Sequence, residues 1–505
     1  MKRLAGFLIL MICIILPLSA ATGVQGKKDY DTLVYAMNTE PARLDPQNDA
    51  LLNTMLVNKQ IYNTLVVKNP ETGEIEPSLA KSWKWANDKT LLVTLRDDVF
   101  FHNGDKLTAE DVLYTLRRFP KGKATGSLFA SFDSENSRVV DAAHIEIKLK
   151  ETYGPALNML TSMKAAIVSK KYCENTPEAK LNREPVGTGP FKFVSWVSGD
   201  RITLKRNDNY WGDKPSYSNL IMRVITDATA RSIEVETGGV DIIDTLNGKD
   251  IDRLEAGVKN VKLYTVPGYK IHYITFNEKD PILSKEKVRL AFAHAINMQA
   301  VIKVAFGSSA IPATSSMATT IFGYKKEGFY ELKPEYSKQL LAEAGYPNGF
   351  STDIILPDVS YNIRLGEAMQ AMLSQVGIKI NIKIVDAATW QTMNREGKAM
   401  LSINNLTADT GDPDHSYTNL YGKSNMLSVK STDAVVNSLL DKGRTELNEA
   451  KRKAIYGELQ DYMFKHAIWI HMSEPIISFA TRSYVQNFVP DAGVQVDLSK
   501  ITIAH

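Results

Sequence analysis

The sequence predicts a mixed α/β protein of more than one domain, for three reasons. The chain has 505 residues, more than a single hydrophobic core usually serves. Several short segments alternate apolar and polar residues, which is typical of half-buried strands. Between them, apolar residues recur every three or four positions, which is typical of helices. Strands that alternate with helices favour sheets that are at least partly parallel, and such sheets bind ligands at the carboxyl ends of their strands, between domains.

Four segments carry the strand pattern most clearly. They are residues 32–37, 91–95, 202–204 and 378–384, and the last has isoleucine at every second position. We therefore expect these segments to lie in sheets, each with one face toward a core.

Helices are expected between the strands, with starts marked by capping residues. Thr108 and Asp111 stand three positions apart before an apolar face, as in a capping box. Ser284 and Ser337 are predicted to cap two further helices. A fourth helix is expected to end at Gly377, directly before the strand at 378.

The first 26 residues are predicted to be a secretory signal peptide, cleaved near 21–26. Lys2 and Arg3 precede an uncharged apolar run at 4–18, and small residues follow at 19–21. The alternative is a membrane anchor, but the run is short for a bilayer and contains Pro17. No later stretch of about 18 uncharged apolar residues exists, so we expect the mature protein to be soluble.

Cysteine and charge content narrow the protein class further. Cys13 lies inside the leader and Cys173 is the one other cysteine, so no intramolecular disulfide is expected. Ile12 precedes Cys13, and no cysteine stands at the cleavage region, so we expect no lipid anchor and a free protein in the periplasm. The formal charge of +3 argues against nucleic acid as a partner.

Several separated motifs make the sequence similar to one family. They occupy residues 76–83, 95–104, 107–112, 186–191, 209–215, 276–277, 288–297 and 341–346. In this order they resemble the peptide-, nickel- and oligopeptide-binding type of extracellular solute-binding protein, the receptors of ABC importers. One such match would be weak evidence for this family, whereas the whole set in this order is specific to it.

Most of these motifs are better explained by structure than by binding. The sequence at 187–190, Gly-Thr-Gly-Pro, suits a chain crossover, and no Lys-Ser/Thr follows as a phosphate-binding loop would require. His102 stands in a predicted turn. His466 and His471 are five positions apart, which fits neither a helix face nor a strand face, so no zinc site is expected there.

The resemblance implies a periplasmic-binding-protein-like α/β fold, with two lobes around a cleft and an additional inserted domain. Lobe I would comprise residues 30–62, 185–274 and 481–505. An inserted domain II would cover 63–184, and lobe III would cover 275–480. Two strands that cross between the lobes would form a hinge, and closure of lobe III onto lobe I would bury the ligand.

The resemblance also implies a binding site. Residues 404–414, NNLTADTGDPD, are similar to the cleft segment of dipeptide-binding members, whose first aspartate pairs with the α-ammonium of the peptide. By position this is Asp409, and a carboxylate in a closing cleft needs such a cationic partner. Asp412 and Asp414 fit loop or capping roles instead. The other expected substrate-binding residues are Thr39, Glu40, Tyr361, Arg364, Thr407 and Ala408.

Two departures leave the ligand open. Dipeptide-binding members carry an arginine just before a tyrosine in the preceding cleft segment, but residues 356–361 contain none, and Arg364 is the nearest substitute. Leu406 also replaces a tryptophan that is common there. Longer peptides or another amine-bearing solute therefore stay possible ligands beside dipeptides.

A nickel-chelate receptor, a secreted hydrolase and a chaperone-like binder are the alternatives to a peptide receptor. His415 resembles the position of a histidine in nickel-chelate binders, but the arginine that those proteins use has no match near Lys164. A secreted hydrolase is disfavoured because no Gly-x-Ser-x-Gly, His-Glu-x-x-His or placed Cys-His pair occurs. A chaperone-like binder of unfolded chains is a third option. We expect no enzyme activity, no cofactor, a monomer, and a membrane permease as the partner.

Overall fold

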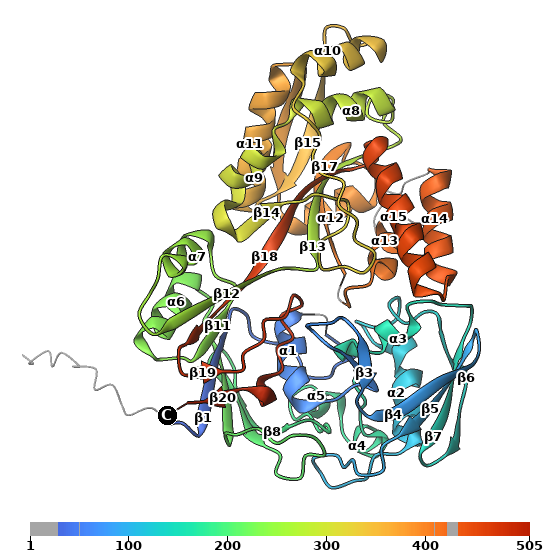
Figure 1. Cartoon of the computed structure of the whole chain (residues 1–505), viewed down its shortest axis with the longest axis vertical. Coiled ribbons are helices and arrows are strands. Elements are labelled where there is room, and N and C mark those ends of the chain that lie inside the picture. Colours follow the sequence, from blue (N-terminus) through green and yellow to red (C-terminus); the bar gives the residue numbers. More distant parts are fainter. Residues whose placement is uncertain (1–28, 50, 409, 422–432, 505) are drawn as a thin grey trace, which may run out of the picture.

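The structure, a computed structural model, describes residues 29–49, 51–408, 410–421 and 433–504, and only the backbone of residues 415 and 419–421. Figure 1 shows two α/β halves, one above the other, with a third region beside the lower half. The α/β class predicted from the sequence is confirmed.

One twelve-stranded sheet runs through both halves. Its order is β16-β15-β17-β13-β18-β11-β1-β10-β9-β8, and β12 and β14 each pair with β18. Its strands are β1 (Thr32–Met37), β8 (Phe191–Val197), β9 (Arg201–Arg206), β10 (Asn219–Val224), β11 (Ile242–Asp244), β12 (Val261–Pro267), β13 (Lys270–Phe276), β14 (Ala310–Pro312), β15 (Phe350–Pro357), β16 (Ile378–Val385), β17 (Leu401–Thr407) and β18 (Ile470–Arg482).

The third region has a separate antiparallel sheet of order β4-β5-β7-β6. Its strands are β4 (Ala80–Asn87), β5 (Thr90–Leu95), β6 (Phe132–Asp141) and β7 (His144–Leu149). Two small pairs complete the strands: β2 (Val66–Lys68) with β3 (Ile75–Pro77), and β19 (Val485–Gln486) with β20 (Thr502–Ile503). Below, lobe I denotes the part around β1 and β8 to β12, lobe II the part around β2 to β7, and lobe III the part around β13 to β17. The residue limits predicted from the sequence stay a prediction.

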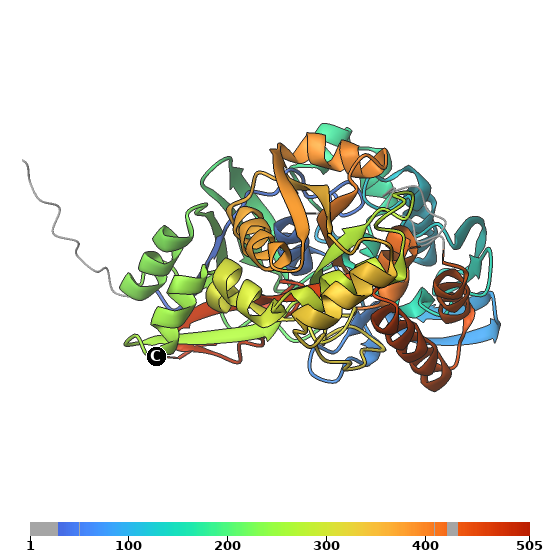
Figure 2. The same ribbon diagram turned by 90° about the horizontal axis from the view of Figure 1, so that it is seen from above.

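Helices cover these sheets. They are α1 (Leu52–Ile61), α2 (Ala109–Arg118), α3 (Ala156–Met159), α4 (Lys170–Glu174), α5 (Glu178–Leu181), α6 (Ala228–Thr237), α7 (Gly248–Glu255), α8 (Glu286–Ala295), α9 (Met298–Phe306), α10 (Pro334–Glu343), α11 (Ser360–Ser374), α12 (Ala387–Arg395), α13 (Pro413–Tyr421), α14 (Ala434–Thr445) and α15 (Glu449–Lys465). Figures 1 and 2 both place α14 and α15 side by side, over lobe II. Within the described ranges no single helix is long and apolar enough to cross a membrane, and one bent pair, α8 with 298–309, passes by length and composition only.

The predicted helix starts were partly right. The capping box before α2 is confirmed, because the Thr108 backbone N–H donates to Asp111 Oδ2 at 2.9 Å. The predictions for Ser284 and Ser337 are wrong. Helix α8 begins after Lys285 without a side-chain cap, and Ser337 lies inside α10, where its hydroxyl donates to the Ala291 carbonyl at 2.7 Å.

Strand β18 belongs to both lobes of the large sheet. Its first residue, Ile470, pairs with Ile274 of β13, and its later residue Thr481 pairs with Ile242 of β11. Strands β12 and β13 run back along it, one in each lobe. Two chain segments therefore connect lobes I and III, and in Figure 1 β18 is the long red strand between the two halves.

Candidate binding cleft

The parallel strands of lobes I and III end toward each other. In lobe III, Thr407 at the end of β17 pairs with Lys270, the residue of β13 nearest lobe I, and β15 runs parallel to β17. In lobe I, Asp244 at the end of β11 pairs with Phe479, which lies nearer to lobe III along β18 than the partners of the other β11 residues. Strand β1 runs parallel to β11. Carboxyl ends of parallel strands are where α/β proteins bind ligands.

The segment after β17 is held by backbone contacts to the hinge. The Ala408 N–H donates to the Tyr269 carbonyl at 2.9 Å, and Ala408 is buried. The Thr407 carbonyl accepts from the Ser416 hydroxyl at 2.6 Å. Gly411 closes a turn onto the Ala408 carbonyl at 2.7 Å with a φ of 68°, a conformation that favours glycine. Asp409, the predicted ammonium partner, lies outside the described residues.

Asp412 has a structural role in this segment. Its carboxylate accepts two hydrogen bonds from the Arg452 guanidinium, at 2.6 and 2.7 Å, and both side chains are buried. It also accepts the Asp414 N–H at 3.0 Å, at the start of α13. Burial would lower the pKa of Arg452, but the Asp412 carboxylate raises that pKa above its usual value. The pair fixes the chain beyond residue 409 to α15.

Tyr361 belongs to an aromatic cluster beside the strand ends of lobe III. Its ring centroid lies 5.0 Å from that of Phe306 and 5.8 Å from that of His272. His272 Nδ1 is 2.9 Å from the Ser473 hydroxyl, and burial lowers the pKa of this histidine to about 3. The imidazole is therefore neutral at physiological pH, and the cluster offers an apolar wall.

Arg364 lies on the exposed side of α11. Its Nε and Nη2 both donate to the Ala305 carbonyl, at 3.0 and 2.6 Å, which ties α11 to the end of α9. The guanidinium is thus used within lobe III, and its predicted role toward a ligand carboxylate stays a prediction.

Thr39 and Glu40 follow β1 at the facing edge of lobe I. The Thr39 carbonyl accepts from Asn53 Nδ2 at 2.8 Å, and its side chain is exposed. The Glu40 carboxylate accepts from Trp196 Nε1 at 2.6 Å, from the Ser198 hydroxyl at 2.9 Å and from the Gly199 N–H. Glu40 therefore joins β1 to the turn between β8 and β9, while Thr39 leaves its hydroxyl free to face solvent.

Arg231 is a buried residue of this edge that sequence reasoning missed. Only 2% of it is exposed, and its guanidinium donates at 2.6–3.3 Å to the carbonyl oxygens of Ile225, Thr226, Asp244 and Thr245. It thus fixes the ends of β10 and β11 relative to each other. Burial raises the pKa of Asp244, which accepts the Tyr35 hydroxyl at 2.8 Å. An arginine on a helix carries no sequence signal for such burial.

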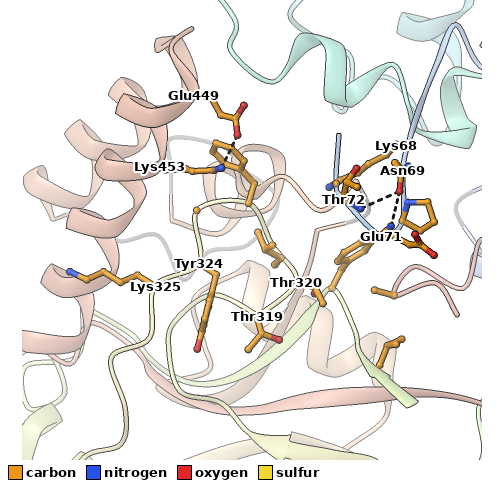
Figure 3. A pocket seen from close by; sticks show the side chains of 18 of the residues that line it. Lys68, Asn69, Glu71, Thr72, Thr319, Thr320, Tyr324, Lys325, Glu449 and Lys453 are labelled. Carbon is orange, nitrogen blue, oxygen red and sulfur yellow. Dashed lines mark hydrogen bonds and ion pairs between the residues drawn. The ribbon is translucent and has the colours of Figure 1, made fainter. Parts of the chain in front are cut away.

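A groove of about 1030 Å³ opens between lobes II and III beside the hinge. Figure 3 shows Lys68 and Glu71 on its lobe II side and Lys453 and Lys325 on the opposite side. Lys453 pairs with Glu449 at 2.7 Å. None of the predicted binding residues that the structure describes lines this groove.

Metal ligands do not gather in the described parts of the chain. No group of three His, Cys, Asp or Glu side chains there could hold a metal ion. His102 Nε2 lies 3.0 Å from the Gly189 carbonyl, and burial lowers the pKa of this histidine to about 4. His471 Nε2 lies 3.1 Å from the Gly328 carbonyl. The side chain of His415 lies outside the part of the structure that is described.

Comparison with known proteins finds relatives along nearly the whole chain. The heme-binding protein A of Haemophilus influenzae is 29% identical, and the match covers 87% of each chain. The dipeptide-binding protein of Escherichia coli (strain K12) is 28% identical over 94% of each chain. The structure of the periplasmic binding protein DppA from Helicobacter pylori, in complex with the peptide STSA, superposes with a TM-score of 0.78 at 26% identity, covering 94% of this chain and 98% of that one.

A family match agrees with these relatives. Residues 74–428 match the family described as bacterial extracellular solute-binding proteins, family 5, middle part. The match covers most of lobe II, strands β8 to β12 of lobe I, and lobe III from β13 through the segment after β17, but not β1 or β18. The chain therefore belongs to the family 5 bacterial extracellular solute-binding proteins.

Proposed function

We propose that the protein is the receptor of an ABC importer, which captures a short peptide between lobes I and III and presents it to a membrane permease. The observation that carries this proposal is the pair of facing strand edges, on two lobes that strands β12, β13 and β18 connect. A ligand that contacts both edges favours the closed arrangement, because it binds that arrangement more tightly than the open one.

A peptide is favoured over other solutes by the relatives and by the chemistry of the edges. One of the relatives is named for dipeptides, and the solved structure of another holds the peptide STSA. Asp409, which directly follows Thr407 and Ala408 in the sequence, is the carboxylate proposed to pair with the ammonium group of the peptide. No free arginine stands at residues 356–361 for the peptide carboxylate, so the site is proposed to accept peptides longer than two residues.

The remaining properties are proposed with this function. The leader would be cleaved near 21–26 and the mature protein would work in the periplasm as a monomer. It would return its ligand unchanged and so would not be an enzyme. Heme, named for one relative, and a nickel chelate are the competing ligands.

Native mass spectrometry of protein purified gently from periplasm tests the proposal, with Asp409→Ala beside it. A heterogeneous set of short-peptide masses on the wild type, lost from the variant, is the expected result. Glu335→Ala removes one exposed carboxylate on α10 and serves as the control, which should keep the peptides. A single heme or nickel-chelate mass, unaffected by Asp409→Ala, would overturn the peptide assignment. Titration with di-, tri- and tetrapeptides then establishes the preferred length.

A further inference from the structure

Lobes II and III touch along a row of hydrogen bonds next to the segment that follows β17. The Tyr153 hydroxyl donates to Asp414 Oδ2 at 3.0 Å. Asn158 Nδ2 donates to the Thr410 carbonyl and hydroxyl, at 3.2 and 3.1 Å. Lys68 Nζ donates to the same carbonyl at 3.2 Å. Three lobe II side chains thus contact two residues of lobe III, Thr410 and Asp414.

Arg444 of α14 extends this contact. Its Nη2 donates to the Ser131 hydroxyl at 2.7 Å and to Glu151 Oε1 at 3.0 Å, both in lobe II. Its Nη1 lies 3.5 Å from Asp414 Oδ2 in its own lobe, and its guanidinium lies 5.0 Å from the centre of the Tyr153 ring. One cation therefore bridges carboxylates of both lobes.

The connections of the chain make this contact conditional on the position of lobe III. Strands β12, β13 and β18 join lobe III to lobe I, whereas the chain enters and leaves lobe II through lobe I, where the Gly189 N–H donates to the Ile61 carbonyl at 2.8 Å. No strand of lobe II pairs with the large sheet in the described residues. Rotation of lobe III about the hinge strands must therefore break the row of hydrogen bonds.

The polar character of the contact suits an interaction that forms and breaks repeatedly. Asp414 is 1% exposed and Tyr153 is 2% exposed. The Tyr153 hydroxyl bonds to Asp414 only while the lobes touch, whereas Asp414 also accepts from the Thr418 hydroxyl of its own lobe at 3.2 Å. On separation water replaces these partners, and the net gain from closing is small compared with the gross hydrogen-bond energy. An apolar contact of this area would instead resist opening.

We propose that Tyr153, Asn158 and Lys68 of lobe II form a latch with Thr410, Asp414 and Arg444 of lobe III, and that this latch sets how long the receptor stays closed on its ligand. The proposal rests on the proposed function for its ligand. It adds that residence time is controlled partly by residues of lobe II, which carries neither of the facing strand edges.

Tyr153→Phe tests the latch, because it removes one hydroxyl and keeps the ring. Tyr172→Phe is the matched control, since that hydroxyl donates to the Glu184 carbonyl at 2.8 Å within lobe II. Small-angle X-ray scattering of each free protein reports the lobe separation, and stopped-flow displacement reports peptide dissociation. Loss of a hydrogen bond to a carboxylate predicts dissociation about tenfold faster for Tyr153→Phe, with association changed by less than about twofold. Its radius of gyration is expected to rise, and Tyr172→Phe is expected to match the wild type.

The outcomes separate the latch from the proposed function. If the wild type binds peptide and Tyr153→Phe dissociates and scatters like Tyr172→Phe, the latch is refuted and the receptor function stands. If the wild type binds no peptide, the function falls, and the scattering of the free variants alone decides for or against the latch. Asn158→Ala, at a half-buried side chain, replaces Tyr153→Phe if the latter unfolds, with the same expected direction.

Discussion

Removing Arg452 is expected to destabilise lobe III strongly. Its guanidinium is 6% exposed and makes two hydrogen bonds to the Asp412 carboxylate, which is 4% exposed. It also donates to the Gly443 carbonyl at 2.8 Å and lies 4.9 Å from the Phe322 ring centre. Arg452→Met keeps most of the packing volume but leaves a buried carboxylate whose remaining hydrogen bond comes from the Asp414 N–H.

The magnitude follows from that isolated charge. Breaking a buried ion pair by removing one partner costs about 3–5 kcal/mol, and we expect Arg452→Met to lose about 4 kcal/mol of unfolding free energy. Adding Asp412→Asn removes the charge while keeping an oxygen for the Asp414 N–H, so the double variant should recover at least about 2 kcal/mol of that loss.

Urea unfolding of the two single variants and the double variant measures these values. Tryptophan fluorescence is a suitable probe because buried Trp469 lies in the same hydrophobic cluster as Tyr456 of α15. Circular dichroism should be recorded in parallel, since a chain with several lobes need not unfold in one step. A loss below about 1 kcal/mol for Arg452→Met, or a double variant as unstable as the sum of the singles, would refute the reasoning.

Two further substitutions test other parts of the molecule. Burial raises the pKa of Glu327 from 4.5 to about 8. The neutral carboxyl group therefore contributes stability that is fully present below pH 4.5 and is lost as the pH rises through 8. Glu327→Gln should therefore melt like the wild type at pH 4 and at a higher temperature at pH 8.5, and equal melting at both values would count against the assignment. Gly187→Ala would place a Cβ 2.1 Å from the Ile61 carbonyl oxygen and should cost about 2–3 kcal/mol in chemical unfolding. Gly457→Ala, whose nearest atom is 3.5 Å away on Lys325, is the control and should be neutral or stabilising.

Local patterns in the sequence predicted local structure well. The alternation at 378–384 became β16, and the capping box at Thr108 became the start of α2. The sequence predicts a chain crossover at Gly187 and Gly189, and both pack against the backbone of Ile61 too closely for a side chain. The strand and the helix start depend on a few neighbouring residues, so spacing alone carries the information, whereas the two glycines contact Ile61, far earlier in the chain.

Features that depend on distant partners could not be predicted in this way. Ser337 has the right residue type for a helix cap, but Pro334 begins the helix earlier and the serine bonds to another helix. Arg231 and Arg452 are charged residues on helices, a pattern typical of solvent-exposed faces, yet both are buried. Carbonyl oxygens at the ends of β10 and β11 hold Arg231, and the Asp412 carboxylate holds Arg452. The partner of Asp412 stands forty residues away, and no spacing rule connects them.

Strand β18 has a consequence for how the chain is made. It supplies the central hydrogen-bonding partner of β11 and β12 in lobe I and of β13 and β14 in lobe III, but it is synthesised after all of them. Neither part of the large sheet can be completed on the ribosome before residue 482 has emerged. The order of translation therefore delays final folding until nearly all of the chain is made.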